Sequence, residues 1–310
     1  MRVLVTGGNG FVGGFAIEAL RARGDEVFAA GRGAVDMMPL DLSDSLNVRG
    51  VIDIAQADAV VHLAAQAFVP QSIADPLETF DVNAMGTARL LEAIRAARDV
   101  GGSNPRVLII STAEVYGAQP PSSFPLKETT SLHPANPYAA SKVAAEAYSL
   151  AAARTYGLDV MVARSFNHIG PGQDERFAVS SFAMQLARIA RGGPSELLVG
   201  ELSAERDFLD VRDVVAAYLA LLDRGERGEI YNVCSGSAIS IRDVLRRLVT
   251  TARVAVEIRE DPARMRPVDI PVSFGENAKL REATGWAPKR PLGETLRAIL
   301  EAHKVRLTAS

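Results

Sequence analysis

Arg2-Val3-Leu4-Val5-Thr6-Gly7-Gly8-Asn9-Gly10-Phe11-Val12-Gly13 joins an apolar run to a turn with three spaced glycines. The run Arg2–Val5 predicts a buried strand, and the residues after the turn predict a helix as far as about Arg23. Glycines in this register permit a tight turn, close approach of the backbone to a pyrophosphate, and close packing of helix on strand. The segment therefore predicts a dinucleotide site whose phosphates are lined by Gly7, Gly10, Phe11, Val12 and Gly13.

Apolar runs and helical segments alternate through the first half of the chain. Further strands are expected at 26–30, 59–65, 106–110 and 158–163. Such alternation is typical of an α/β fold with a doubly wound parallel sheet of the Rossmann type. From about residue 174 the pattern is irregular, with a helix expected at Val211–Arg224 and a strand at Ile230–Val233. We therefore expect a dinucleotide-binding domain at 1–173 and a smaller mixed α/β C-terminal lobe at 174–310, interleaved with the first domain.

The composition is that of an ordinary soluble protein, with 48% hydrophobic residues, 23% charged residues and a formal net charge of -3. This mildly acidic balance lacks the charge footprint of a nucleic-acid-binding protein, and no apolar run is long enough for a membrane helix. We therefore expect no nucleic acid and no membrane among its partners, and a cytoplasmic location. The single cysteine, Cys234, excludes an internal disulfide and a thiolate metal site, and we interpret it as an inert buried thiol. No metal site is predicted.

A hydroxyl and a carboxylate follow the strand expected at 106–110, in Ser111-Thr112-Ala113-Glu114. Tyr138 and Lys142 are four residues apart, which places them on one face of a helix. An ammonium beside a phenol favours the phenolate, so we expect Lys142 to lower the Tyr138 pKa from about 10 to near 7. The pattern predicts an acid–base centre of Thr112, Tyr138 and Lys142, with Glu114 as a further candidate catalytic residue.

The end of the second strand bears on the choice of cofactor. It ends in Ala29-Ala30-Gly31-Arg32, without an acidic residue to bond a ribose 2′-hydroxyl. Arg32 favours NADP(H), whereas NAD(H) stays possible if Arg32 is only a solvated loop charge. Asp41 and Leu42 follow a short strand, and we expect them to flank the adenine.

The exit of the strand at 59–65 is expected to face the cofactor, because small side chains at Ala64 and Ala65, after Leu63, let the backbone approach it. His62 lies inside the same run, and we interpret it as a core histidine rather than a catalyst.

A long amphipathic helix is expected at Leu77–Asp99, and we expect its Asn83 to bond the strand that carries Thr112. The helix near 138–156 has a face of small residues. Together with the helix near 77–99, this face predicts a homodimer, and close packing on the parent sheet is the alternative.

The glycine turn, Thr112, Tyr138 and Lys142 together resemble the extended short-chain dehydrogenase/reductase family, over almost the whole chain. Within that family, three stretches resemble the GDP-4-keto-6-deoxy-D-mannose reductases, which make GDP-D-rhamnose: 166–173, 206–211 and 231–236. Residues 261–267 and 284–286 fit the same group. The related GDP-mannose 4,6-dehydratases have a different, Arg-containing continuation after the shared Asn167-His168.

The resemblance implies NADPH-dependent reduction of the 4-keto group of a GDP-6-deoxy-hexose. Thr112 would hydrogen-bond the substrate oxygen at C4, Tyr138 would protonate it, and Lys142 would hold the nicotinamide ribose. Among residues implied to bind the GDP-sugar are Asn167, Arg206 and Arg266. For Arg206, an ion pair with a neighbouring aspartate is the structural alternative.

Glu114 keeps other functions open. By resemblance it occupies the position of the base in nucleotide-sugar 4,6-dehydratases, where it would also contact the substrate. A dehydratase usually has a polar residue where this chain has Ala113, which weakens elimination chemistry. The alternatives are a dehydratase of the GDP-mannose type, a 4-epimerase, and a non-enzymatic dinucleotide-sensing regulator.

Overall fold

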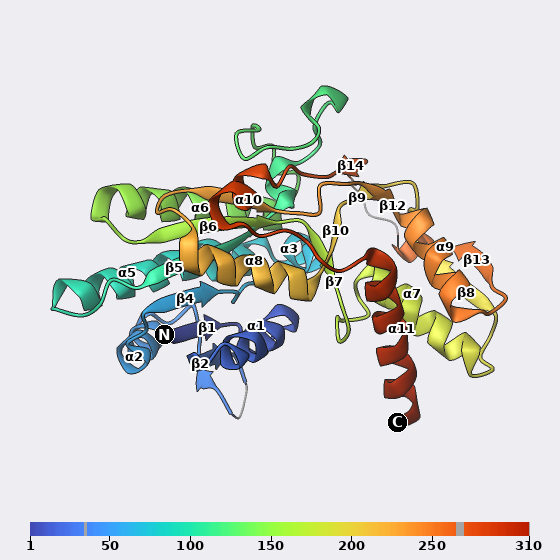
Figure 1. Ribbon diagram of the computed structural model, residues 1–310, viewed down its shortest axis with the longest axis horizontal. Coiled ribbons are helices and arrows are strands. Elements are labelled where there is room, and N and C mark those ends of the chain that lie inside the picture. The colour runs from blue at the N-terminus through green and yellow to red at the C-terminus, as the bar shows by residue number, and fades with distance from the viewer. Residues whose placement is uncertain (34–35, 265–269, 310) are drawn as a thin grey trace.

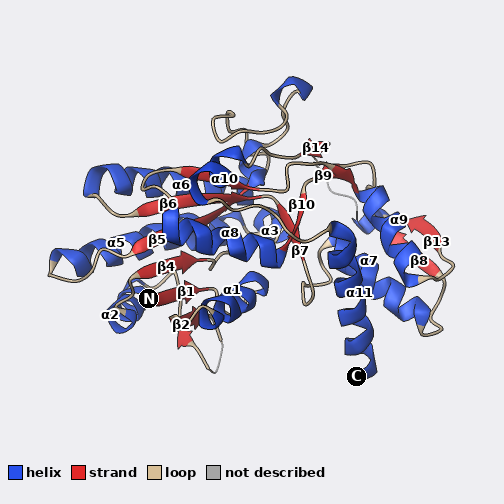
Figure 2. Cartoon of the chain, viewed as in Figure 1, coloured by secondary structure: helices blue, strands red, loops and turns tan. Residues whose placement is uncertain are grey.

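The computed structural model describes residues 1–33, 36–264 and 270–309. Its largest element is a parallel sheet of seven strands in the order β11-β6-β5-β4-β1-β2-β3 (Figures 1 and 2). The order reverses between β1 and β4, as in a doubly wound fold, so the expected fold class is confirmed. The strands are β1 (Arg2–Thr6), β2 (Glu26–Gly31), β3 (Met38–Pro39), β4 (Ala59–His62), β5 (Arg106–Thr112), β6 (Val160–Ser165) and β11 (Ile230–Val233).

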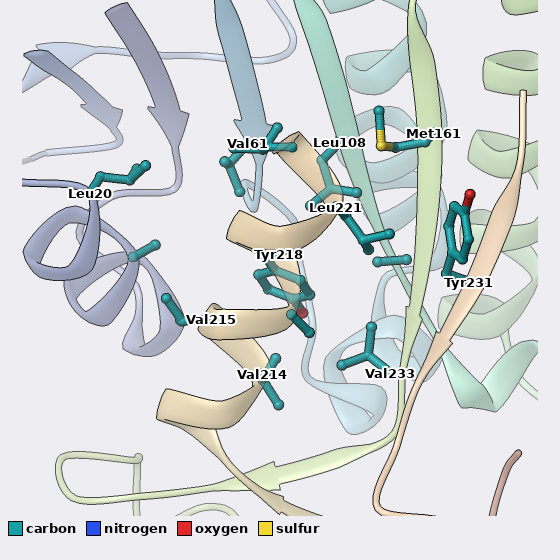
Figure 3. Packing of buried hydrophobic residues seen from close by; sticks show 14 of the residues in the cluster. Leu20, Val61, Leu108, Met161, Val214, Val215, Tyr218, Leu221, Tyr231 and Val233 are labelled. Atoms are coloured by element: carbon teal, nitrogen blue, oxygen red, sulfur yellow. The ribbon is translucent and has the colours of Figure 1, made fainter. Parts of the chain in front are cut away.

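Helices cover both faces of this sheet because successive strand side chains point to opposite sides. Val3 and Val5 pack in one core with α1 (Phe11–Ala22), α8 (Val211–Arg224) and α10 (Ala278–Thr284). Leu4 lies between them in the sequence and points to the opposite face. There it packs in a second core with α2 (Ser45–Ala55) and with the helices at 86–99 and 137–156. Figure 3 shows the first core, where Tyr218 and Leu221 of α8 lie against Val61, Leu108 and Met161 of the sheet.

The second lobe has its own apolar core between α7 (Ala178–Ala190), α9 (Ile241–Ala252) and α11 (Leu292–Ala309). Its short strands form three small sheets: β7 (Asn167–Ile169) with β10 (Phe208–Asp210), β8 (Glu196–Val199) with β13 (Glu257–Glu260), and β9 (Glu205–Arg206) with β12 (Ile239–Ser240) and β14 (Val272–Ser273). In Figure 1 this lobe lies at the right, with the C-terminus on α11. Because β11 and α8 return to the large sheet, the chain crosses between the two parts more than once.

The helix expected at Leu77–Asp99 consists of three successive segments. It runs as α4 (Pro76–Phe80), a wider π-helical turn η1 (Asp81–Met85), and α5 (Gly86–Asp99). Asp75 caps its start by accepting a hydrogen bond from the Glu78 amide at 3.0 Å. A π turn inserts an extra residue into a helix and is frequent near functional sites. Here the inserted turn contains Asn83.

The remaining elements of the described chain are four short ones and one long helix. They are α3 (Val69–Ala74) after β4, the 3-10 turns η2 (Ala113–Tyr116), η3 (Pro121–Ser123) and η4 (Pro262–Arg264), and the 20-residue helix α6 (Pro137–Tyr156) on the α5 face of the sheet. Among the described residues, no helix is both long and apolar enough to span a membrane. The same part of the chain has no group of three or more His, Cys, Asp or Glu arranged to hold a metal ion.

Candidate active site

Helix α6 begins with the expected acid–base residues. Asn136 caps it, since its side-chain oxygen accepts a hydrogen bond from the Ala139 amide at 2.8 Å, and Pro137 occupies the first turn. Tyr138 lies at the start of the helix, and Lys142 lies one turn later on the same face. The helix packs on β5 and β6, so both side chains reach the carboxyl edge of the sheet.

Thr112 and Glu114 meet Tyr138 at this edge. Thr112 ends β5, and its hydroxyl accepts a hydrogen bond from the Glu114 amide at 3.2 Å, which starts the η2 turn. The Thr112 side chain also hydrogen-bonds the Tyr138 side chain. The Glu114 carboxylate accepts a hydrogen bond from Asn136 Nδ2 at 3.2 Å. The structure thus brings these predicted residues together from a strand end, a turn and a helix start.

Burial sets the protonation states of the centre. It raises the pKa of Tyr138 to about 12, although the hydrogen bond with Thr112 opposes the shift. It also lowers the pKa of Lys142 to about 8, against the opposing charge of Glu146. Lys142 Nζ donates to the Ile110 carbonyl oxygen at 2.8 Å.

The expectation that Lys142 brings the Tyr138 pKa near 7 is therefore wrong. Loss of solvation of the phenolate outweighs the hydrogen bond that would stabilise it, and the ammonium of Lys142 is directed at the backbone of β5. At neutral pH Tyr138 is a protonated phenol and Lys142 is mostly charged. Such a pair can donate a proton to a developing oxyanion.

The glycine turn forms a cradle that a side chain would fill. Gly7 has a φ of +71°, and a Cβ there would lie 2.7 Å from the amide nitrogen of Ala64. A Cβ on Gly13 would lie 2.8 Å from the Cα of Gly8. Gly10 precedes α1 and offers no side chain to cap its amides, while Phe11 and Val12 form its first turn. The chain therefore fits a pyrophosphate at this helix start.

The residues expected near the adenine lie beyond the ends of β2 and β3. Arg32 is exposed, and its carbonyl oxygen accepts a hydrogen bond from Asn9 of the glycine turn at 2.9 Å. Asp41 accepts hydrogen bonds from the Ser43 hydroxyl at 2.7 Å and amide at 2.9 Å. These bonds, and then the charge of Arg32, lower the Asp41 pKa. Leu42 is buried under α5.

The exit of β4 lies beside the glycine turn. The Leu63 amide donates to the Thr6 carbonyl oxygen at 3.2 Å, and the Ala64 amide donates to the Thr6 hydroxyl at 3.3 Å. Ala65 follows and is half-buried. His62 is buried between Thr6 and Thr87, and its pKa is lowered to about 3, mainly by burial. The interpretation of His62 as a core histidine is confirmed.

Asn83 does not bond the strand that carries Thr112, so this expectation is wrong. Its side chain accepts from the Gln66 amide at 2.8 Å and donates to the Gln66 carbonyl oxygen at 2.9 Å. It also donates to the Ser141 hydroxyl at 3.0 Å. The π turn therefore joins the exit of β4 to the catalytic helix.

Two of the predicted sugar-nucleotide residues lie on the short strands of the second lobe. Asn167 begins β7 and is exposed, and Arg206 ends β9 and is buried. Arg206 Nη1 donates to the Glu205 carbonyl oxygen at 2.9 Å. The carboxylate of Asp207 accepts hydrogen bonds from the Ser235 and Gly236 amides at 2.7 and 2.9 Å. Arg266 lies outside the described residues.

A ring contact joins the two sides of the site. The Phe11 ring stacks on His168 with centroids 6.3 Å apart and planes 9° apart. Phe11 belongs to the dinucleotide turn, and His168 to the stretch after β6. The predicted cofactor and substrate segments are therefore in direct contact.

Comparison with known proteins identifies the family of this arrangement. The model of the family described as GDP-mannose 4,6 dehydratase matches residues 4–299. A GDP-6-deoxy-D-mannose reductase from Pseudomonas aeruginosa is 45% identical over 251 residues, which cover 81% of each chain. GDP-mannose 4,6 dehydratase 1 from Arabidopsis thaliana is 33% identical, over 80% of this chain and 68% of the relative. The chain belongs to the GDP-mannose 4,6 dehydratase family, within the extended short-chain dehydrogenases/reductases.

Solved structures of related nucleotide-sugar enzymes have the same fold as this chain. The structure of RMD from Pseudomonas aeruginosa complexed with NADPH superposes with a TM-score of 0.88 at 39% identity, covering 99% of this chain and 98% of that one. A UDP-glucose 4-epimerase from Thermus thermophilus in complex with NAD has a TM-score of 0.85 at 34% identity, over 98% of this chain and 99% of that one.

This member of the GDP-mannose 4,6 dehydratase family has a buried polar network behind its acid–base centre. The sequence patterns did not predict this network. Glu146 and Arg164 form its ion pair at 2.7 Å, and the Ser111 hydroxyl donates to Glu146. The four-residue spacing of Tyr138, Lys142 and Glu146 is a signal that would have located Glu146 on the same helix face. Arg164 has no such signal, because its partner lies on a different element.

Proposed function

We propose that the protein catalyses the NADPH-dependent reduction of the 4-keto group of a GDP-6-deoxy-hexose, from GDP-4-keto-6-deoxy-D-mannose to GDP-D-rhamnose. The observation that carries this proposal is the pairing of the Tyr138 and Thr112 side chains at the carboxyl edge of the sheet, where burial raises the Tyr138 pKa and so favours the protonated phenol. Reduction of a ketone needs such an acid beside the carbonyl oxygen. The relative named GDP-6-deoxy-D-mannose reductase and the RMD structure with NADPH support the substrate class and the cofactor.

In this proposal, each residue has the role that the family resemblance implies. Tyr138 gives its proton to the C4 oxygen, Thr112 orients that oxygen, and Lys142 binds the nicotinamide ribose. NADPH, when bound, supplies the hydride. The glycine turn holds the pyrophosphate, and Arg32 favours the 2′-phosphate of NADP(H) over NAD(H), which remains a possible cofactor. Asn167, Arg206 and Arg266 bind the GDP-sugar.

The test is anaerobic incubation with GDP-4-keto-6-deoxy-D-mannose and NADPH. We expect equimolar loss of reduced nicotinamide and formation of a GDP-6-deoxy-hexose, identified by NMR. A parallel measurement compares thermal stabilisation by GDP, UDP and dTDP, of which GDP should stabilise most. Product formation without net loss of NADPH would reject reduction as the reaction.

A second candidate function is a nucleotide-sugar 4,6-dehydratase. The observation that favours it is the Glu114 carboxylate, held by Asn136 next to Tyr138 and Thr112, where a base could remove a proton from the sugar. Incubation with GDP-mannose and catalytic NADP⁺ tests it directly. Formation of a 4-keto-6-deoxy sugar at the rate of the reduction would favour this candidate.

A homodimer through the helices near 77–99 and 138–156 belongs to the same proposal. Large apolar side chains are exposed along α3, α4 and η1: Ile73, Leu77, Phe80 and Met85. Leu77 is 81% exposed. A second copy would remove this apolar surface from water. We also propose that the enzyme is located in the cytoplasm.

A further inference from the structure

Helix α6 carries a third ionisable residue on its catalytic face. Tyr138, Lys142 and Glu146 follow one another at four-residue spacing, which aligns them along one side of the helix. Lys142 is 8% exposed and Glu146 is 2% exposed. A buried carboxylate therefore lies one turn beyond the buried ammonium.

Arg164 of β6 holds this carboxylate in place. Its Nη2 lies 2.7 Å from Glu146 Oε2, and its Nε donates to both Glu146 oxygens at 3.1 and 3.2 Å. The other arm of the guanidinium donates to the Tyr116 hydroxyl at 3.1 Å and to the Glu128 carbonyl oxygen at 3.0 Å. Contacts on both arms fix the orientation of the guanidinium, and with it the position of Glu146.

Stability alone does not account for a buried ion pair at this place. Taking two charges out of water costs about as much as their attraction returns, and apolar pairs of the same volume are often equally stable. The Glu146–Arg164 pair lies instead where it can act on the acid–base centre. Ser111, whose hydroxyl donates to Glu146, directly precedes Thr112. The charge of Glu146 also raises the Lys142 pKa against the effect of burial.

We propose that Glu146, clamped by Arg164, is a positioning residue that keeps the Lys142 ammonium charged and fixes the strand end carrying Thr112. The role in catalysis rests on the proposed reductase function, whereas the electrostatic coupling of Glu146 to Lys142 does not. Glu146 therefore acts through Lys142 and Ser111 and does not contact the substrate.

Other ionisable groups surround α6 on each element near it. On the elements packed against α6 they are Glu78 of α4, Asp81 of η1, Arg89, Glu92, Arg95, Arg98 and Asp99 of α5, Arg106 of β5, Glu114 and Tyr116 of η2, and Arg164 of β6. Arg98 donates a hydrogen bond to the Tyr156 carbonyl oxygen at the far end of α6, and His62 of β4 is near enough for the Lys142 charge to act on it. Within the described residues, Glu146 is the group whose charge acts on the Lys142 pKa. His62 is neutral because its own pKa is lowered to about 3.

The direct test is a pH titration of lysine side chains by NMR, on protein labelled with carbon-13 at the lysine ε position. Lys127, Lys279, Lys289 and Lys304 are exposed or half-buried, so the buried Lys142 should titrate at the lowest pH. Its signal is assigned by its loss in Lys142→Met. This measurement needs no sugar substrate, so it stays valid even if the proposed function fails.

Two variants should shift this titration in opposite directions. Glu146→Gln with Arg164→Met removes both charges and keeps an acceptor for Ser111, and we expect the Lys142 midpoint to fall. Arg164→Met alone removes the positive charge paired with Glu146, so the Glu146 carboxylate acts on Lys142 without that compensation. We therefore expect the Lys142 midpoint to rise. Because the directions differ, either variant decides the question if the other does not fold. A midpoint equal to that of the wild type in a folded variant would overturn the proposal.

Glu92→Gln is the matched control. Glu92 accepts hydrogen bonds from Tyr148 of α6 and from Arg95, so the same carboxylate-to-amide change is made against the same helix. We expect it to leave the Lys142 midpoint unchanged. In turnover assays the Glu146→Gln/Arg164→Met enzyme should lose activity at a lower pH than the wild type, with kcat reduced about 10-fold at neutral pH and KM for the sugar little changed. An equal loss in Glu92→Gln would indicate a general effect on packing and would reject the assignment.

Discussion

Lys142 and Ile110 are joined by a hydrogen bond of 2.8 Å from the ammonium to the backbone carbonyl oxygen. Ile110 lies in β5, two residues before Thr112, and Lys142 lies in α6, one turn after Tyr138. The bond therefore links the strand and the helix that carry the two hydroxyls of the candidate site. Because this bond directs the Lys142 ammonium at the backbone of β5, burial rather than the ammonium controls the ionisation of Tyr138.

Tyr138→Phe should bind NADPH normally and lose turnover by at least about 100-fold, because it removes the proton donor without changing the shape of the site. Binding is measured by nicotinamide fluorescence, and turnover by the loss of NADPH with the keto-sugar. Tyr156→Phe, at the exposed end of the same helix, is the control and should be fully active. Turnover near that of the wild type in Tyr138→Phe would refute its role as the acid.

The rate of reduction should fall as the pH rises through about 8. Burial lowers the pKa of Lys142 to about 8, so its charged form is present below that pH and lost above it. Tyr138, with a pKa of about 12, stays protonated over the same range and does not contribute to the loss. A kcat profile at saturating NADPH measures this. A rate that stays constant into the range where free lysine ionises would contradict the prediction.

Glu114→Gln separates reduction from dehydration. Under the reductase assignment the amide still accepts from Asn136, and the rate should stay within about 10-fold of the wild type, since no proton is removed from carbon. Both GDP-4-keto-6-deoxy-D-mannose reduction and GDP-mannose dehydration are assayed. Thr112→Val, which removes the hydroxyl beside Tyr138, should slow either reaction. If Glu114→Gln alone lowers the rate of GDP-mannose dehydration by about 100-fold, the result would favour the dehydratase.

Arg32→Ala should raise the KM for NADPH by about 10- to 100-fold and leave that for NADH nearly unchanged, because only NADPH has a 2′-phosphate for the guanidinium to bind. Steady-state kinetics with both cofactors measure the ratio. Arg49→Ala is the control, since Arg49 pairs with Asp53 on the surface of α2. Equal effects on both cofactors would remove Arg32 from the cofactor site.

Leu77→Asp should convert the proposed dimer to a monomer, because it places a charge in the exposed apolar surface of α3, α4 and η1. Sedimentation velocity at several concentrations measures the state. Leu46→Asp is the control: Leu46 is 83% exposed on α2, on a surface without this apolar cluster. A wild-type protein that is monomeric at all concentrations would reject the dimer.

Local patterns accounted for most of the fold. The helix Val211–Arg224 and the strand Ile230–Val233 have the bounds that their apolar periodicity predicted. The Asn136 cap and the glycine turn also follow from residues close in the chain. Such features depend on backbone preference and side-chain spacing, which are properties of short segments.

By itself, therefore, the sequence determined the α/β class, the glycine turn and the spacing of Tyr138 and Lys142 along one helix. Only the tertiary structure decided the partners of Asn83, the pairing of Glu146 with Arg164, and the direction of the Tyr138 pKa shift. The physical reason is that hydrogen bonds between distant segments, and the solvation lost on burial, depend on what the packed elements bring together. Spacing within one segment does not contain that information.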